Sequence, residues 1–172
     1  RNGVVGAASF DAAFREYIRR WAFKHPTPGD FFRTVENVTG QELSWFWRAF
    51  IYSDDVLDIG IESVTSTAAA DGSQDAAIAL KRFTPVPFPV TLRLALADGS
   101  SKDVRLPVDI WARTTTFTAI VPVAAQVVGV RLWPDPSVPD FNAANDTWGQ
   151  APAANTPAPV TSGGLSGQIP SR

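Results

Sequence analysis

Two stretches near the middle of the chain alternate strictly between apolar and polar side chains, and this period of two limits what the chain can fold into. The apolar residues at every second position are Val90, Leu92, Leu94 and Leu96, then Val104, Leu106, Val108 and Ile110. A period of two places successive side chains on opposite faces of a β-strand, so each stretch predicts a strand with one buried face. Asp98-Gly99 between them is a turn signal, and an antiparallel hairpin is expected.

Further short runs of β-branched residues extend this pattern over residues 56–140. They are 59–67, 75–83, 117–121 and 127–133, with the turn signal Asp71-Gly72 between the first two. About six evenly spaced short strands joined by turns are typical of an antiparallel, immunoglobulin-like β-sandwich.

The prolines and tryptophans of this region indicate where the sheet edges and the core lie. Pro85, Pro87 and Pro89 lack a backbone N–H, so they are expected at a strand start or a sheet edge. Trp111 and Trp133 follow predicted strands and are expected to plug the core.

Residues 1–55 repeat apolar side chains at helical spacing instead. The apolar face of the first predicted helix consists of Phe10, Phe14, Tyr17, Ile18 and Trp21. Ser9 is a candidate N-cap for this helix, and Pro26 ends it. Thr27-Pro28 with Asp30 predicts the start of a second helix, which Gly40 follows.

A third helix is predicted to begin at the capping-box pattern Thr39-Gly40-Gln41-Glu42. Its apolar residues are Leu43, Phe46, Trp47, Phe50 and Ile51. Three short helices this rich in aromatic residues would expose much apolar area alone, so we expect them to need a larger partner surface.

These patterns predict an α+β fold in three parts. Residues 1–55 form a short helical bundle, residues 56–140 form the β-sandwich, and residues 141–172 form a strand-exit loop followed by a flexible tail rich in Pro, Ala, Gly and Ser. The sequence begins with Arg1 and contains no Met, so we expect a piece of a longer protein, with a cleaved mature protein as the alternative.

Composition excludes several classes of function. A formal net charge of −2 argues against a general nucleic-acid binder, which needs a basic face for phosphates. No apolar run approaches the roughly 18 residues that a membrane span requires. The chain has no Cys, which removes disulfides, thiolate metal ligands and a Cys nucleophile.

The ligands for a catalytic metal are also scarce. A catalytic zinc takes three protein ligands, whereas this chain has one His, no Cys and no His-Glu-x-x-His. His25 beside Pro26 is expected to be a packing or capping imidazole. The same lone His would have to serve any Ser triad, and no Gly-x-Ser-x-Gly is present. We therefore assign no catalytic, cofactor-binding or metal residue.

Two groups of acidic residues are candidates for chemistry. The run 135–142 (Asp-Pro-Ser-Val-Pro-Asp-Phe-Asn), with Asn145 and Asp146 after it, is rich in oxygen ligands and suits a calcium loop, although it matches no EF-hand. Asx side chains commonly bind their own backbone in such loops, so a structural strand-exit loop is favoured. Asp54-Asp55 could be an acid pair, but is favoured as the junction between the third helix and the first strand.

Two helical faces are candidates for binding. The aromatic set Trp45, Phe46, Trp47 and Phe50 could line a ligand groove, but its helical spacing favours core or interdomain packing. A basic face, interrupted by Glu16, consists of Arg15, Arg19, Arg20 and Lys24. A solvated face is favoured over a binding patch there.

Several segments nevertheless resemble a known enzyme family. The helical ones are 10–17 (FDAAFREY), 24–32 (KHPTPGDFF) and 39–47 (TGQELSWFW), and the strand-region ones are Pro87-Phe88-Pro89-Val90, Asp98-Gly99, Pro107-Val108 with Trp111, and the stretch from Asp135-Pro136 to Trp148. In this order they resemble the end of the catalytic domain of membrane alanyl aminopeptidases, the gluzincin aminopeptidases, and the β-sandwich that follows it in bacterial members. The resemblance covers residues 10–148.

The resemblance implies that the chain is the C-terminal part of a zinc metallopeptidase that removes N-terminal amino acids from peptides. The family's His-Glu-x-x-His helix, third Glu ligand, Gly-rich motif and catalytic Tyr would all precede Arg1, and Tyr17 does not occupy the place of that tyrosine. The parent's zinc would activate water. This chain would be inactive alone, with a scaffolding role.

The implied partner is the remainder of the catalytic domain, packed against the aromatic helices, and peptides would be substrates of the parent only. A periplasmic or secreted location is weakly favoured. The alternative function is a non-catalytic extracellular β-sandwich module that binds carbohydrate or protein, and a third is an interaction domain that caps a partner through the helical aromatics.

The shortage of metal ligands predicts the behaviour of the purified chain. After incubation with zinc and gel filtration, it is expected to retain far less than one zinc per chain and to hydrolyse no aminoacyl test substrate. Elemental analysis and a chromogenic assay measure both. One zinc per chain together with hydrolysis would contradict the assignment of no metal site.

Overall fold

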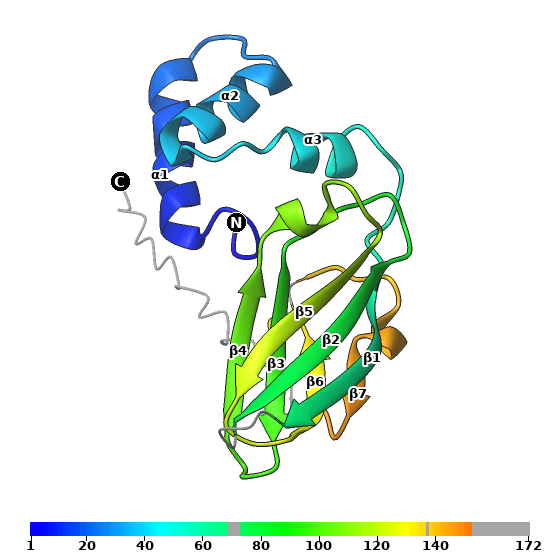
Figure 1. Cartoon of the computed structure of the whole chain (residues 1–172). Coiled ribbons are helices and arrows are strands. Elements are labelled where there is room, and N and C mark those ends of the chain that lie inside the picture. The colour runs from blue at the N-terminus through cyan, green and yellow to red at the C-terminus, as the bar shows by residue number, and fades with distance from the viewer. Residues whose placement is uncertain (69–72, 137, 153–172) are drawn as a thin grey trace, which may run out of the picture.

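The structure is a computed structural model that describes residues 1–68, 73–136 and 138–152. Helices α1 (Ala7–Trp21), α2 (Pro28–Thr39) and α3 (Ser44–Phe50) come first in the chain, and the strands follow. Figure 1 shows the helices grouped beyond one end of the strands, with α3 nearest to them. The α+β class predicted from the sequence is confirmed.

Within the described residues, the strands form two antiparallel sheets. One has the order β1-β2-β5, and the other has the order β4-β3-β6-β7. Their bounds are β1 (Ile59–Ala68), β2 (Gln74–Arg82), β3 (Val90–Leu96), β4 (Ser101–Leu106), β5 (Thr116–Val123), β6 (Val127–Leu132) and β7 (Thr147–Gly149). The chain therefore changes sheet between β2 and β3, between β4 and β5, and between β5 and β6.

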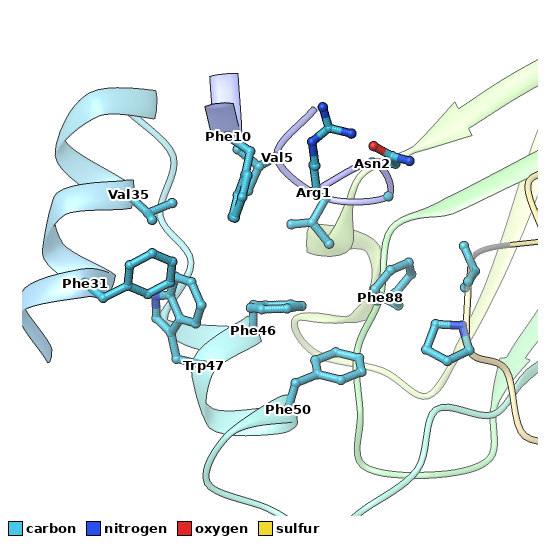
Figure 2. Close-up of a pocket in the computed structure, with 14 residues that line it drawn as sticks. Arg1, Asn2, Val5, Phe10, Phe31, Val35, Phe46, Trp47, Phe50 and Phe88 are labelled. Atoms are coloured by element: carbon cyan, nitrogen blue, oxygen red, sulfur yellow. The ribbon is translucent and has the colours of Figure 1, made fainter. Parts of the chain in front are cut away.

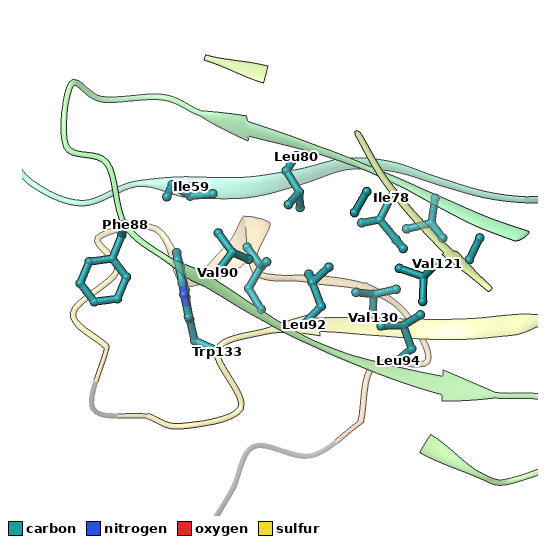
Figure 3. Packing of buried hydrophobic residues seen from close by; sticks show 14 of the residues in the cluster. Ile59, Ile78, Leu80, Phe88, Val90, Leu92, Leu94, Val121, Val130 and Trp133 are labelled. Carbon is teal, nitrogen blue, oxygen red and sulfur yellow. The ribbon is translucent and has the colours of Figure 1, made fainter. Parts of the chain in front are cut away.

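The two sheets share one hydrophobic core, as the alternating pattern requires. Every second residue of β3 is fully or almost fully buried, beginning with Val90. Ile78 and Leu80 of one sheet meet Leu92 and Val130 of the other (Figure 3). The antiparallel sandwich is thus confirmed, whereas its immunoglobulin-like character stays a prediction.

Two strand predictions were wrong. The second alternating stretch does not run to Ile110, because β4 ends at Leu106 and Val108–Trp111 forms a 3-10 helix. Pro107 cannot donate to a strand ladder, and the helical turn after it carries Trp111 into the core. Strand β7 lies within the segment predicted as loop and tail, and pairs with β6. The turn Asp71-Gly72 and the tail from residue 153 lie outside the described residues.

The helix boundaries were predicted in part. Thr27 caps α2 as expected, because its backbone N–H and hydroxyl both donate to the Asp30 carboxylate, at 2.8 and 2.7 Å. These bonds, with a further one from Arg33, lower the pKa of Asp30. Gly40 ends α2 in the left-handed region, at φ 67°.

The other two cap predictions were wrong. The N-cap of α1 is Gly6, and Ser9 lies within the helix. Thr39 is the last residue of α2, where its hydroxyl donates to the Val35 carbonyl oxygen, so it cannot cap the next helix. Helix α3 begins at Ser44, whose N–H donates to the Glu42 carboxylate.

The two core tryptophans fix the proline-rich segment between β2 and β3. The Trp111 indole N–H donates to the Phe88 carbonyl oxygen at 2.8 Å, and the Trp133 indole N–H donates to the Pro89 carbonyl oxygen at 3.2 Å. Both indoles are buried, which confirms the predicted plugs. Both carbonyl oxygens thereby accept a hydrogen bond in a segment whose prolines have no N–H to donate.

Replacing Trp111 with Phe tests this anchoring. The Trp111→Phe variant leaves the Phe88 carbonyl oxygen without its donor and removes ring volume, so the free energy of unfolding should fall by about 2–4 kcal/mol. Urea denaturation measures it. Ile120→Val, on the exposed side of β5, is the control and should change stability by less than about 0.5 kcal/mol. Equal stability of the two variants would contradict the anchoring.

Candidate functional site

An apolar groove lies between the helices and the near end of the sandwich. Its cavity volume is about 550 Å³, and its lining comes from all three helices and the β2–β3 segment. The principal lining residues are Phe10, Phe31, Val35, Phe46, Phe50 and Phe88 (Figure 2). We call this cavity the aromatic groove.

Helix α3 joins the two sides of the aromatic groove. Towards the sandwich, the rings of Trp45 and Phe50 contact Phe88, with centroids 6.3 and 5.9 Å apart. Towards the helices, Trp47 stacks on Phe32 at 4.3 Å and meets Phe31 edge-on at 6.2 Å. The predicted packing role of this aromatic set is confirmed, and Phe46, Trp47 and Phe50 also line the groove.

A carboxylate that the sequence analysis missed fixes the α2–α3 connection. Oε1 of the partly buried Glu36 accepts hydrogen bonds from the Trp47 indole N–H at 3.0 Å and from the Leu43 N–H at 3.2 Å. The sequence gives little sign of this role for Glu36, because a Glu on an amphipathic helix usually faces solvent. Glu36 sets the orientation of α3 against α2.

The charge at the mouth of the groove is already paired. The Arg1 guanidinium donates two hydrogen bonds to the Asp11 carboxylate, at 2.9 and 2.7 Å. This pair raises the pKa of Arg1 and lowers the pKa of Asp11. The groove therefore presents mainly apolar surface rather than a charge.

Two arginines of the basic face of α1 share one carboxylate of the same helix. The Glu16 carboxylate accepts hydrogen bonds from Arg19 at 2.7 and 2.6 Å and from Arg20 at 2.6 Å, and these bonds lower the pKa of Glu16 to about 2. Lys24 lies over the Trp21 ring. This arrangement supports the solvated face and not a concentrated binding patch.

The lone imidazole and the acid pair bring no chemistry together. His25 is exposed in the α1–α2 loop, so the packing role expected for it was wrong. Asp54 and Asp55 are exposed after α3, and the Ser53 hydroxyl binds both the carboxylate and the N–H of Asp55. Within residues 1–68, 73–136 and 138–152, no three His, Cys, Asp or Glu side chains are grouped so that they could hold a metal ion.

The acidic loop uses its oxygens to bind the neighbouring chain. The Asp140 carboxylate accepts from the Ile59 N–H at 3.1 Å and from the Asn142 N–H at 2.8 Å. The Asn145 amide donates to Asp58 at 2.9 Å. These bonds support the structural strand-exit loop over a calcium site, although Ser137 of this run lies outside the described residues.

Comparisons with known proteins leave the family open. No protein-family model matches the chain, and no curated protein matches it. No helix in the described part of the chain is both long and apolar enough to span a membrane.

Removing the ring that joins the two sides of the groove should be costly. Phe88→Ala deletes contacts with Trp45, Phe50 and Trp133, and is expected to lower the free energy of unfolding by about 3–5 kcal/mol. Phe141→Ala makes the same change where the side chain is 74% exposed, and should cost less than about 0.5 kcal/mol. Urea denaturation compares the two, and similar losses would contradict the role of Phe88.

Proposed function

We propose that this chain is the closing part of a gluzincin-type zinc aminopeptidase, in which its helices support the catalytic domain and its sandwich carries those helices. The ordered resemblance over residues 10–148 supports this proposal. The role of the chain is scaffolding, and the residues that bind zinc and peptide belong to the polypeptide ahead of Arg1.

The observation that carries the proposal is an uncovered apolar face on α1. Phe14 is 46% exposed and Ile18 is 50% exposed, one helical turn apart. Helix α2 covers the other side of α1, where Tyr17 meets Phe31 with ring centroids 5.1 Å apart. A helix whose apolar stripe is wider than its neighbour can cover needs a further partner.

The contacts between the helices and the sandwich fix where this apolar face of α1 points. Helix α1 packs on α2, Phe32 of α2 stacks on Trp47 of α3, and α3 contacts Phe88, so this chain of contacts sets the direction of the α1 face relative to the sandwich. Phe10 of the aromatic groove stacks on Phe14 at 6.1 Å, so the apolar surface continues from the groove onto the exposed side of α1. A catalytic domain packed there would bury both.

A binding module remains the second candidate, and the aromatic groove favours it. The groove suits an apolar peptide segment better than a sugar, because Trp111 and Trp133 of the sandwich are buried and offer no stacking platform. A peptide that shifts tryptophan fluorescence of the isolated chain with saturation would support this candidate.

The coding sequence ahead of Arg1 tests the proposal directly. An in-frame His-Glu-x-x-His, followed by a Glu ligand, is expected there, and the longer polypeptide should cleave aminoacyl test substrates when loaded with zinc. An in-frame coding sequence that lacks the motif would overturn the proposal and leave the binding module.

The exposed face itself can be tested in the purified chain. Phe14→Ser with Ile18→Ser is expected to reduce binding of an apolar fluorescent dye and to reduce self-association at high concentration, because the partner surface becomes polar. Phe141→Ser with Ile120→Ser removes the same side chains from exposed positions on the sandwich and serves as the control. Dye fluorescence and sedimentation velocity measure both, and equal effects of the two pairs would contradict a docking face on α1.

A further inference from the structure

The segment that closes the sandwich beyond β6 is held by a cluster of carboxylates. After β6 the chain crosses to the start of β1, where Leu57 and Asp140 form a parallel bridge, and it then returns as β7 beside β6. Asp58, Asp140 and Asp146 all lie along this seam between the two sheets. We call residues 140–149 the seam segment.

Backbone and side-chain hydrogen bonds tie the seam segment to both sheets. The Asp140 carboxylate accepts from the Ile59 N–H of β1, and the Asp146 carbonyl oxygen accepts from the Leu132 N–H of β6 at 2.8 Å. Gly60 leaves the space that Asn145 fills, since a Cβ there would lie 2.6 Å from the Asn145 side chain. The seam segment therefore bridges the sheets by close packing.

One carboxyl oxygen in the cluster is buried without a hydrogen bond. Oδ1 of Asp146 is buried and accepts no hydrogen bond within the described residues. The charged groups that face it are Asp58 ahead of β1, Asp140 of the seam segment and Arg131 of β6. Two carboxylates against one guanidinium, in a partly buried place, favour the neutral acid.

We propose that this cluster is a pH-sensitive latch, in which the neutral Asp146 carboxyl keeps the seam segment docked and its deprotonation loosens β7 from β6. The latch is independent of the proposed peptidase role, because it involves residues of the sandwich alone.

The direction of the effect follows from linkage. Burial, and next the charge of Asp140, raises the pKa of Asp146 to about 7, against an ordinary value of 3.8 when the segment is solvated. The docked form therefore holds more protons than the open form between these two values, so docking is strongest below the open-state value of 3.8 and weakens as the pH rises to about 7. Burial likewise raises the pKa of Asp140, which acts in the same direction.

Amide hydrogen exchange of the full chain measures the latch. The Leu132 N–H and the Gln150 N–H, which donates to Val128, lie on either side of β7 and report its docking. Their protection factors are expected to fall by about tenfold or more from pH 5 to pH 8, since each unit of pKa shift corresponds to a tenfold change in the equilibrium. Ile78 in β2, away from the seam, provides the reference.

Two variants separate the latch from general effects of pH. Asp146→Asn cannot ionise, so the pH dependence of its Leu132 and Gln150 protection between pH 5 and pH 8 should fall to the smaller part that Asp140 contributes. Asp103→Asn removes a carboxylate of the same sheet whose pKa is lowered by Arg93, and it should keep the pH dependence of the parent chain.

A direct titration completes the test without any variant. Carbon-13 NMR of the Asp146 carboxyl is expected to show a midpoint near 7. A midpoint near 4, protection factors that are equal at pH 5 and pH 8, or a pH dependence in Asp146→Asn as large as in the parent chain would each overturn the proposal.

Discussion

The burial of Phe88 between α3 and the sandwich is the interaction on which the rest of the structure depends. Pro87 and Pro89 on either side of it have fixed φ angles and no N–H, so this segment cannot join a sheet ladder and instead projects its ring towards the helices. The Trp111 and Trp133 indoles hold the Phe88 and Pro89 carbonyls in place. The ring then contacts Trp45 and Phe50, which fixes α3 and, through Trp47 and Phe32, fixes α2.

These contacts explain why the apolar face of α1 stays exposed. A loosely attached helix could turn Phe14 and Ile18 towards its own neighbours, whereas α1 packs on α2 through Tyr17 and keeps them outward. The proposal that a catalytic domain occupies this face uses that outward direction. The aromatic groove extends the same apolar surface inward to Phe88.

The sequence predicted the elements with strong local patterns and missed those set by distant contacts. The alternation in β3, the capping box at Thr27 and Asp30, and the glycine stop at Gly40 are local and were correct. Strand β7 was missed because three residues carry too little pattern, and their pairing with β6 depends on contacts across the sandwich. The 3-10 turn after β4 replaced an alternating strand because burial of Trp111 outweighed the local period.

In the candidate site, too, the features with a local sequence pattern were predicted and those made by distant contacts were missed. The helical spacing of Trp45, Phe46, Trp47 and Phe50 predicted packing, but no local pattern shows that Phe88, almost 40 positions further along, completes the groove. The bonds of Glu36 and the raised pKa of Asp146 were also not predicted, because both come from partners that the fold brings to these residues and not from spacing. The exposed position of His25 was also not predicted, because its place beside Pro26 at the expected helix end does not show which way the side chain faces.

Residue-resolved hydrogen exchange under native conditions tests most directly whether the helices and the sandwich unfold as one cooperative unit. If Phe88 joins them, the hydrogen-bonded amides at the end of α3, such as that of Ile51, should open with the same free energy and the same urea dependence as core amides of β3. Opening of α3 with little urea dependence, while β3 stays fully protected, would contradict the account.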